Sequence, residues 1–438
     1  MFLGAILLLY LLWNPASLKN ISVRDVIAWN SRQESLELSD VLLPEAIVYT
    51  PGDGRYFVET AAVDEGYSCA EELIRRCFSG ESVQIDEVIE SGYNMMLRSF
   101  RTAYLDTNWG LSFSRYLSYL GCYTSTATNN IGSFRQIAFS QADETAIFVA
   151  AQDGRYYRIQ GNLTGGSAEE LALCLSSYRN DDVAYEASTI LGGSSDIKLS
   201  LSPALSPAEK IVSRDYDEQQ IARRLFGSTF DFVRRFSDSF GNISYMYGYG
   251  EKSLYLSSDG SLEYSQSIDE DLSELEYLTE ILEIIGLVGK PEGELRLALG
   301  QSKGNAESYC FRQYIDGLPV NCPEEYIISC KIENSMLSVS FSDMYSIEMD
   351  AYEEGAEIAD PANLIASDCN YMYNILSGSI LSANSDEAFS YIIEVLDGAE
   401  ICYFMDGDRL VPAWKLSAED YSFYFNMYTS EPVGTEKQ

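Results

Sequence analysis

The side chains that could perform chemistry in this 438-residue chain are carboxylates, cysteines and tyrosines, because the sequence contains no histidine. The absence of histidine excludes Ser-His-Asp and Cys-His catalytic arrangements and removes the commonest zinc ligand. Two acidic residues could still serve as the acid and the nucleophile of a glycosidase. With 67 Asp and Glu residues, chance pairs are frequent, and none lies in a recognisable catalytic motif. We therefore predict no catalytic residues and a protein that is not an enzyme.

Acidic turns that contain glycine are the segments closest to ligand-binding loops. The segments PGDGR, QDGR and MDGDR lack the alternating oxygen ligands and final Glu of an EF-hand calcium loop. The YGYG segment with Gly248 and Gly250 does not precede an expected helix, so it does not match a phosphate-binding loop. These segments predict hairpin turns, with no bound metal and no cofactor.

The nine cysteines show no C-x-x-C spacing, and their number is odd. This pattern favours buried thiols that pack as small hydrophobic side chains over a disulfide framework. A single bond between Cys322 and Cys330 is left as an open alternative.

The net charge of −38 opposes binding to the phosphate backbone of nucleic acids. Tyrosine is abundant, with 32 residues, and several of the tyrosines alternate along expected strands. Alternating aromatic residues are typical of sheet packing, and an interaction surface is the alternative. The tyrosines in these strands are Tyr245, Tyr247, Tyr249, Tyr255, Tyr264, Tyr421, Tyr424 and Tyr428.

The first thirteen residues, Met1 to Trp13, carry no charged side chain and end in an aromatic residue typical of a membrane interface. The run is shorter than the roughly 20 residues of a spanning helix, and it lacks the basic region and cleavage site of a signal peptide. We interpret residues 1–20 as part of a single-pass transmembrane anchor whose cytoplasmic start would precede them. The alternative is a buried N-terminal helix.

Beyond the anchor, the periodicity predicts an α+β fold with several modules of antiparallel sheet and packed helices. We expect an N-terminal α+β domain at 21–199, a middle domain at 200–290 and a C-terminal domain at 291–438. Strands are expected at 46–49, 55–59, 134–139, 146–150, 156–159, 243–247, 254–257, 262–264, 295–299, 309–315, 327–332, 337–341, 400–404, 410–415 and 421–427. Helices are expected at 70–77, after an N-cap at Ser167, and at 216–226, 272–285, 363–376 and 386–396.

Three local signals refine these elements. The Ser- and Pro-rich segment SLSPALSPAEK at 200–210 predicts a linker. Ser267 and Glu270 form the pattern of a capping box before the helix at 272–285. Pro412 cannot donate a ladder hydrogen bond, so we expect its strand to begin there or to lie at a sheet edge, and we expect Trp414 to be structural.

Several segments, taken in order, resemble the YycH family. They are LLWNP at 11–15, LLPEAIVY at 42–49 and ISYMYGYGEKSLYLSSDGSLEY at 243–264. The segments FRQYIDGLPVN at 311–321 and RLVPAWKLSAEDYSFYFNMYTSE at 409–431 are similar to the partner family YycI and to PepSY-type modules.

The resemblance implies a membrane-anchored, extracytoplasmic and non-enzymatic regulator of a Gram-positive sensor histidine kinase that controls cell-wall metabolism. Such a protein acts by protein–protein association, and a second regulator of the YycI or YycH type is a further implied partner. The resemblance brings no catalytic, cofactor-binding or metal-binding residue. The alternative is an extracellular PepSY-like module that binds or inhibits a peptidase or binds a wall polymer.

Overall fold

The computed structural model describes residues 36–437, except for 62, 81–82, 176–182, 193–196, 201–206, 215, 270–271, 304–305, 322–325, 352–357 and 379–383. The expected anchor at residues 1–20 lies outside the described residues. Among the helices that are described, none is both long enough and apolar enough to cross a bilayer.

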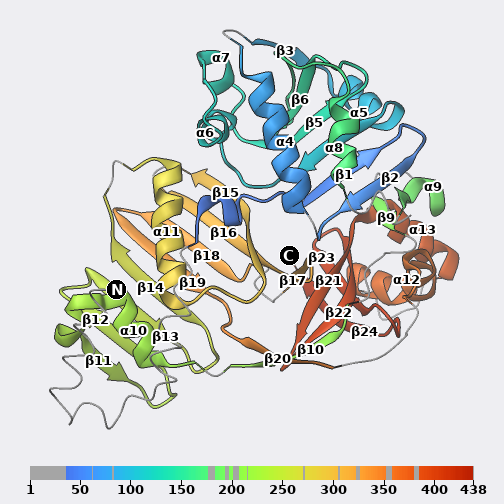
Figure 1. Ribbon diagram of the computed structural model, residues 1–438. Helices are drawn as coiled ribbons and strands as arrows, with labels where there is room; N and C mark the ends of the chain where they lie inside the picture. Colours follow the sequence, from blue (N-terminus) through green and yellow to red (C-terminus); the bar gives the residue numbers. More distant parts are fainter. Residues whose placement is uncertain are drawn as a thin grey trace.

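The N-terminal lobe is built on a nine-stranded antiparallel sheet with the order β3-β7-β6-β5-β4-β1-β2-β8-β9 (Figure 1). Its strands are β1 (Ala46–Thr50), β2 (Arg55–Glu59), β3 (Gln84–Val88), β4 (Thr102–Asp106), β5 (Phe134–Ser140), β6 (Ala146–Ala151), β7 (Tyr156–Gln160), β8 (Ala184–Glu186) and β9 (Lys198–Ser200). Its helices are α3 (Leu38–Val41), α4 (Val63–Cys77), α5 (Glu90–Ser99), α6 (Phe113–Tyr119), α7 (Thr126–Asn129), α8 (Ser167–Leu173) and α9 (Ala187–Ile190).

Strand alternation gives this sheet two apolar faces. Ile47 and Leu105 point toward the side covered by α4 and α8, and Val48 and Tyr104 point toward the side covered by α5. A sheet that is covered on both faces needs apolar residues at successive positions, as the fully buried strand β6 has.

The rest of the chain forms one continuous fifteen-stranded sheet that serves two lobes. The middle lobe holds β11 (Arg234–Ser237), β12 (Ile243–Tyr247), β13 (Lys252–Leu256), β14 (Leu262–Ser267), β15 (Glu294–Lys303), β16 (Ala306–Ile315), β18 (Ile328–Glu333) and β19 (Met336–Phe341). The C-terminal lobe holds β10 (Glu209–Ser213), β20 (Ser346–Ala351), β21 (Leu396–Asp406), β22 (Arg409–Ala418), β23 (Tyr421–Asn426) and β24 (Pro432–Lys437). Strand β17 (Leu318–Asn321) joins the lobes by pairing antiparallel with β16 and parallel with β21.

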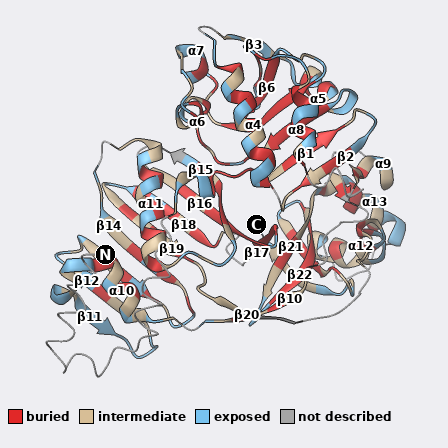
Figure 2. Ribbon diagram, in the orientation of Figure 1, coloured by how far each residue is buried: buried red, intermediate tan, exposed pale blue. Residues whose placement is uncertain are grey.

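Helices cover one face of each half of this sheet. In the middle lobe, α10 (Glu218–Phe226), the 3-10 helix η3 (Gly227–Phe232) and α11 (Glu274–Val288) contribute to the core. In the C-terminal lobe, α12 (Pro361–Ser377) and α13 (Ser385–Val395) pack on β22 and β23. Figure 2 shows the buried residues following the strands and the inner faces of these helices.

The N-terminal and middle lobes share one hydrophobic core. Helix α3 packs against β15 and α11, and buried Trp109 donates its Nε1–H to the carbonyl of Leu43 at 2.9 Å. Gly110, at φ +68°, meets Gly300 of β15 so closely that an added Cβ would lie 1.7 Å from the Gly300 oxygen. Only glycine permits this backbone approach between the lobes.

The expected start of α11 is wrong. Its N-cap is Ser273, which forms a capping box with Glu276, whereas Ser267 is the last residue of β14 and Glu270 lies outside the described residues. The Ser267 amide donates to the carbonyl of Glu251 at 3.0 Å, so the strand ladder takes the group that a helix start would need. A similar shift occurs at α8, where Gly166 is the N-cap and Ser167 is the first helical residue.

Two expectations about β10 and β22 need correction. The segment expected as a linker ends in strand β10, and Lys210 is buried there with its Nζ 2.8 Å from Asp316.

Strand β22 begins before Pro412 and lies inside the sheet. Pro412 falls where the pairing of β22 changes from β10 to β23, and its carbonyl accepts from Met427 at 3.0 Å. A missing N–H is tolerated at such a break in the ladder.

The division into domains at 21–199, 200–290 and 291–438 is still a proposal. Strands β14 and β19 lie on either side of the proposed boundary between residues 290 and 291. They pair along their full length, so the two parts of the chain share one sheet there.

Candidate interaction surface

The eight tyrosines singled out in the sequence divide between core and surface. Tyr245 and Tyr264 are buried against Phe226 of α10, with ring centroids at 6.5 and 6.2 Å, and Tyr424 is buried in the C-terminal lobe. Tyr249 is fully exposed and Tyr255 is 42% exposed. Tyr247, Tyr421 and Tyr428 are half-buried. Sheet packing therefore explains some of these residues, and exposure singles out Tyr249 and Tyr255.

Exposed apolar side chains gather on the face of the middle lobe's sheet that points away from α10. Cross-strand register places Phe236, Ser244 and Tyr255 in one row across β11, β12 and β13, and Met246 in the next row. We call this surface, made of Phe236, Met246 and Tyr255, the outer apolar face. Phe232 at the end of η3, and Phe240 and Tyr249 in the adjoining turns, extend the exposed apolar area. Such clusters on a soluble domain are typical of contact sites.

Strand β11 lies at one end of the fifteen-stranded sheet, and all four of its residues are exposed (Figure 2). The guanidinium of Arg235 turns to the helical side, where it donates to Glu218 at 3.0 Å and to the Tyr245 hydroxyl at 3.3 Å. Arg234 lies on the opposite face, in register with Met246. The edge thus exposes apolar rings, one arginine and unpaired backbone groups.

A second unusual feature is a cluster of charges where the three lobes meet. We call Glu45, Arg296, Arg312, Glu400 and Lys415 the interlobe charge cluster. Buried Arg296 donates to the carbonyls of Pro44 at 3.2 Å and Thr60 at 2.9 Å, stacks 3.9 Å over the Tyr314 ring and pairs with Glu294 at 2.6 Å. Glu400 of β21 lies 3.1 Å from Lys415 and 4.0 Å from Arg312.

The environment of Glu45 raises its pKa to about 7. Burial is the largest cause, and the nearby carboxylates Asp106 and Glu400 add to it, while Arg312 and Arg296 act in the opposite direction. By solvent exposure the residue is half-buried, so water partly screens this effect. Glu45 can therefore change its charge near neutral pH at the junction of the lobes.

Glu400 titrates in the opposite sense. Burial acts to raise its pKa, but the charges of Lys415 and Arg312 outweigh it and leave the pKa below its ordinary value. Its side chain is 38% exposed, so this carboxylate keeps contact with solvent while it neutralises a buried lysine.

A cleft with a volume of about 510 Å³ lies between α10, the end of α11 and the segment after β19. Gln313 lines this cleft, donates to the Glu292 carbonyl at 2.7 Å and accepts from the Tyr345 hydroxyl at 2.5 Å. Arg214 and Asp343 form a bidentate ion pair beside it, at 2.9 and 2.8 Å. These polar groups therefore have partners within the protein.

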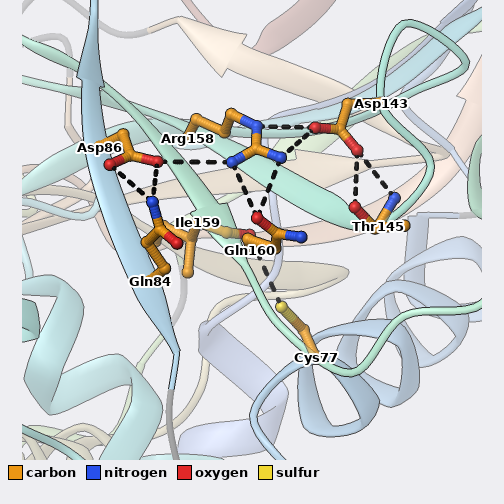
Figure 3. A network of polar contacts seen from close by, with 8 residues as sticks. All are labelled: Cys77, Gln84, Asp86, Asp143, Thr145, Arg158, Ile159 and Gln160. Carbon is orange, nitrogen blue, oxygen red and sulfur yellow. Dashed lines mark hydrogen bonds and ion pairs between the residues drawn. The ribbon is translucent and has the colours of Figure 1, made fainter.

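A polar network in the N-terminal lobe ties the edge strand β3 to its neighbours (Figure 3). Arg158 of β7 lies between Asp86 of β3, at 3.4 Å, and Asp143, to which its Nε donates at 2.6 Å. Burial acts to raise the pKa of Asp143, but hydrogen bonds from Thr145 and Arg158 keep it below its ordinary value. Each polar side chain in this network has a partner within the protein, so we interpret the network as one that stabilises the position of β3.

The remaining candidates for chemistry are cysteines and acidic clusters. The described cysteines are thiols, and Cys77, Cys330, Cys369 and Cys402 are buried. The open alternative of a bond to Cys322 involves a residue outside the described ones. Among the described residues, no group of three or more Cys, Asp or Glu is arranged to hold a metal ion.

Comparison with solved structures finds a similar fold in the crystal structure of YycH from Bacillus subtilis. The TM-score is 0.56, and the alignment covers 88% of this chain and 96% of that one. This chain shares the YycH fold. At 12% sequence identity the similarity shows the fold alone. No protein-family model and no curated protein matches the sequence.

These findings confirm the expected α+β class and the YycH-like architecture. The likeness of the C-terminal part to YycI and PepSY modules stays a prediction. Sequence reasoning missed Phe232, Phe236 and Phe240, which are more exposed than most of the tyrosines in this region. The segment VRRFSDSF, where aromatic and charged residues alternate, held the signal for this surface.

Proposed function

We propose that this protein is an extracytoplasmic regulator of a sensor histidine kinase, held at the membrane by its N-terminal segment and acting by association. The similarity of fold to YycH over 88% of the chain is the observation that carries the proposal. The proposal includes control of cell-wall metabolism as the kinase output and a second regulator of the YycI or YycH type as a further partner.

Regulation by association requires that the protein bind one state of its partner more tightly than another. A preference of about 1.4 kcal/mol changes a two-state ratio tenfold. The outer apolar face supports this proposal, because burying Met246 and Tyr255 against a partner would supply energy of this size. Membrane anchoring raises the effective concentration of both proteins, so a weak interface suffices.

The test is deletion of the gene followed by complementation in the native bacterium. Deletion should change transcription of the kinase's target genes, and the anchored full chain should restore it. A Met246→Ser/Tyr255→Ser variant should restore it poorly. Tyr123→Ser, which alters an even more exposed ring on the N-terminal lobe, should restore it fully and serves as the control.

Two results would overturn the proposal. One is kinase output that does not change on deletion. The other is hydrolysis of a wall polymer or tight inhibition of a peptidase by the purified protein, which would favour the alternative of an extracellular PepSY-like binding module.

A further inference from the structure

The outward side of β11 offers backbone groups in a defined pattern. The Asp238 amide donates to the Asn242 carbonyl, and the same register pairs Phe236 with Ser244 and Arg234 with Met246. In an antiparallel ladder, hydrogen-bonded and non-hydrogen-bonded pairs alternate. Arg235 and Ser237 therefore direct their N–H and C=O groups away from β12, toward open solvent.

The side chains along this edge are self-complementary about Phe236. In an antiparallel pairing of two β11 strands centred on Phe236, Arg235 of each copy lies opposite Ser237 of the other. These are the residues with free backbone groups, and each such pair exchanges both of its hydrogen bonds. Arg234 then lies opposite Asp238, which places unlike charges directly across the ladder. A pairing centred on Arg235 would instead place Arg235 of one copy opposite Arg235 of the other, so that like charges meet across the ladder.

We propose that β11 pairs with β11 of a second copy of this chain, about a two-fold axis through Phe236. Isologous contact of one surface with itself is the commonest way for a soluble protein to form a dimer. Charged residues usually protect a sheet edge from such pairing. Here the charge of Arg235 lies on the helical side, held by Glu218, and that of Arg234 meets Asp238 of the other copy.

Dimerisation through β11 joins the two outer apolar faces. Phe236 of one copy packs beside Phe236 of the other, and Met246 and Tyr255 of both copies continue the surface on each side. The inference does not depend on the proposed role in kinase regulation, since it concerns only two copies of this chain.

Disulfide trapping tests the register directly in the full chain in detergent. In a non-hydrogen-bonded pair the two Phe236 Cα atoms would lie about 4.5 Å apart, which fits a disulfide. Phe236→Cys should therefore form covalent dimers under mild oxidation. Ser244→Cys is the matched control: it lies on the same face, one strand farther from the axis on each copy, so its Cα atoms would be about 14 Å apart. The unsubstituted chain measures the background from the native cysteines and from association through Met1–Trp13, which all variants share.

Charge exchange supplies an independent test by sedimentation equilibrium. Arg234→Glu and Asp238→Lys should each weaken self-association by about tenfold, because each places like charges across the ladder. An equimolar mixture of the two variants should recover the association of the unsubstituted chain, because every pair is then again of opposite charge. Circular dichroism checks the fold of Asp238→Lys, since Asp238 also accepts from the amides of Phe240 and Asn242.

The proposal fails if the Phe236→Cys protein forms no more covalent dimer than the Ser244→Cys protein. It also fails if the mixture of charge variants associates no better than each variant alone. If the Asp238→Lys protein does not fold, the comparison of covalent dimers between the Phe236→Cys and Ser244→Cys proteins is sufficient to test the proposal.

Discussion

Replacing Glu45 with Gln should stabilise the protein above pH 7 and leave its stability near pH 4 almost unchanged. In the folded protein the Glu45 pKa is about 7, above its ordinary value of 4.5, so the folded state binds the proton more tightly than the unfolded state. The stability that this proton contributes is complete below the unfolded pKa and is lost as the pH rises through the folded pKa. A glutamine side chain at this position carries no charge at any pH, so the Glu45→Gln protein would avoid this loss.

The size of the effect follows from the two pKa values. A difference of one in pKa corresponds to about 1.4 kcal/mol, so a change from 4.5 to about 7 gives an upper figure of about 3 kcal/mol. Because Glu45 is half-buried, screening by water reduces the expected gain to about 2 kcal/mol. The gain should develop between pH 4.5 and 7, the range between the two pKa values.

The assay measures the free energy of unfolding of the unsubstituted and Glu45→Gln proteins in urea, at several pH values between 4 and 8. Glu400→Gln is the contrasting variant from the same cluster. This substitution removes the Glu400 carboxylate that lies 3.1 Å from Lys415 and leaves the buried lysine without its partner. The Glu400→Gln protein should therefore be less stable than the unsubstituted protein at neutral pH, and the difference should be smaller in acid, where Glu400 is protonated. The reasoning is refuted if Glu45→Gln destabilises the protein at pH 8, or if its effect is the same at every pH.

Three further predictions concern packing and edges. Trp414→Ala should lower the free energy of unfolding by about 3 to 5 kcal/mol, seen as a lower melting temperature, because the ring is buried and its Nε1–H donates to a backbone carbonyl at 3.0 Å. Gly300→Ala should loosen the contact between the N-terminal and middle lobes, because the new Cβ would lie 2.4 Å from the Trp109 oxygen; faster amide exchange at the junction is the readout. Arg158→Ala should increase amide exchange in Gln84–Val88 more than elsewhere, since it removes the ion pair between Arg158 of β7 and Asp86 of that edge strand.

Elements with strong local patterns were predictable from the sequence. Strands β1, β2 and β5 to β7 follow the expected ranges closely, because each has a continuous apolar or alternating run between clear turn residues. Helix α11 was also expected, but its start was misplaced because two Ser-x-x-Glu patterns compete in the sequence and only tertiary pairing decides between them.

The features that depend on distant contacts could not be read from the sequence. The interlobe charge cluster brings together residues near positions 45, 300 and 400, and no local pattern marks them as neighbours. Alternation in β12 and β13 predicts two faces, but which face a helix covers depends on where α10 packs. This is why Tyr245 is buried while Tyr255 is exposed.

The position of β10 beside both β20 and β22 has a mechanical consequence. The chain leaves the C-terminal lobe after β10 and returns at β20, and these two strands pair with each other while Arg214 and Asp343 close the base of the excursion. A pulling force applied between the ends of the described chain would pass from β10 directly into β22 through their shared ladder. Tension carried along the backbone would therefore have to shear β10 from β20 and β22 before it reached the chain between them.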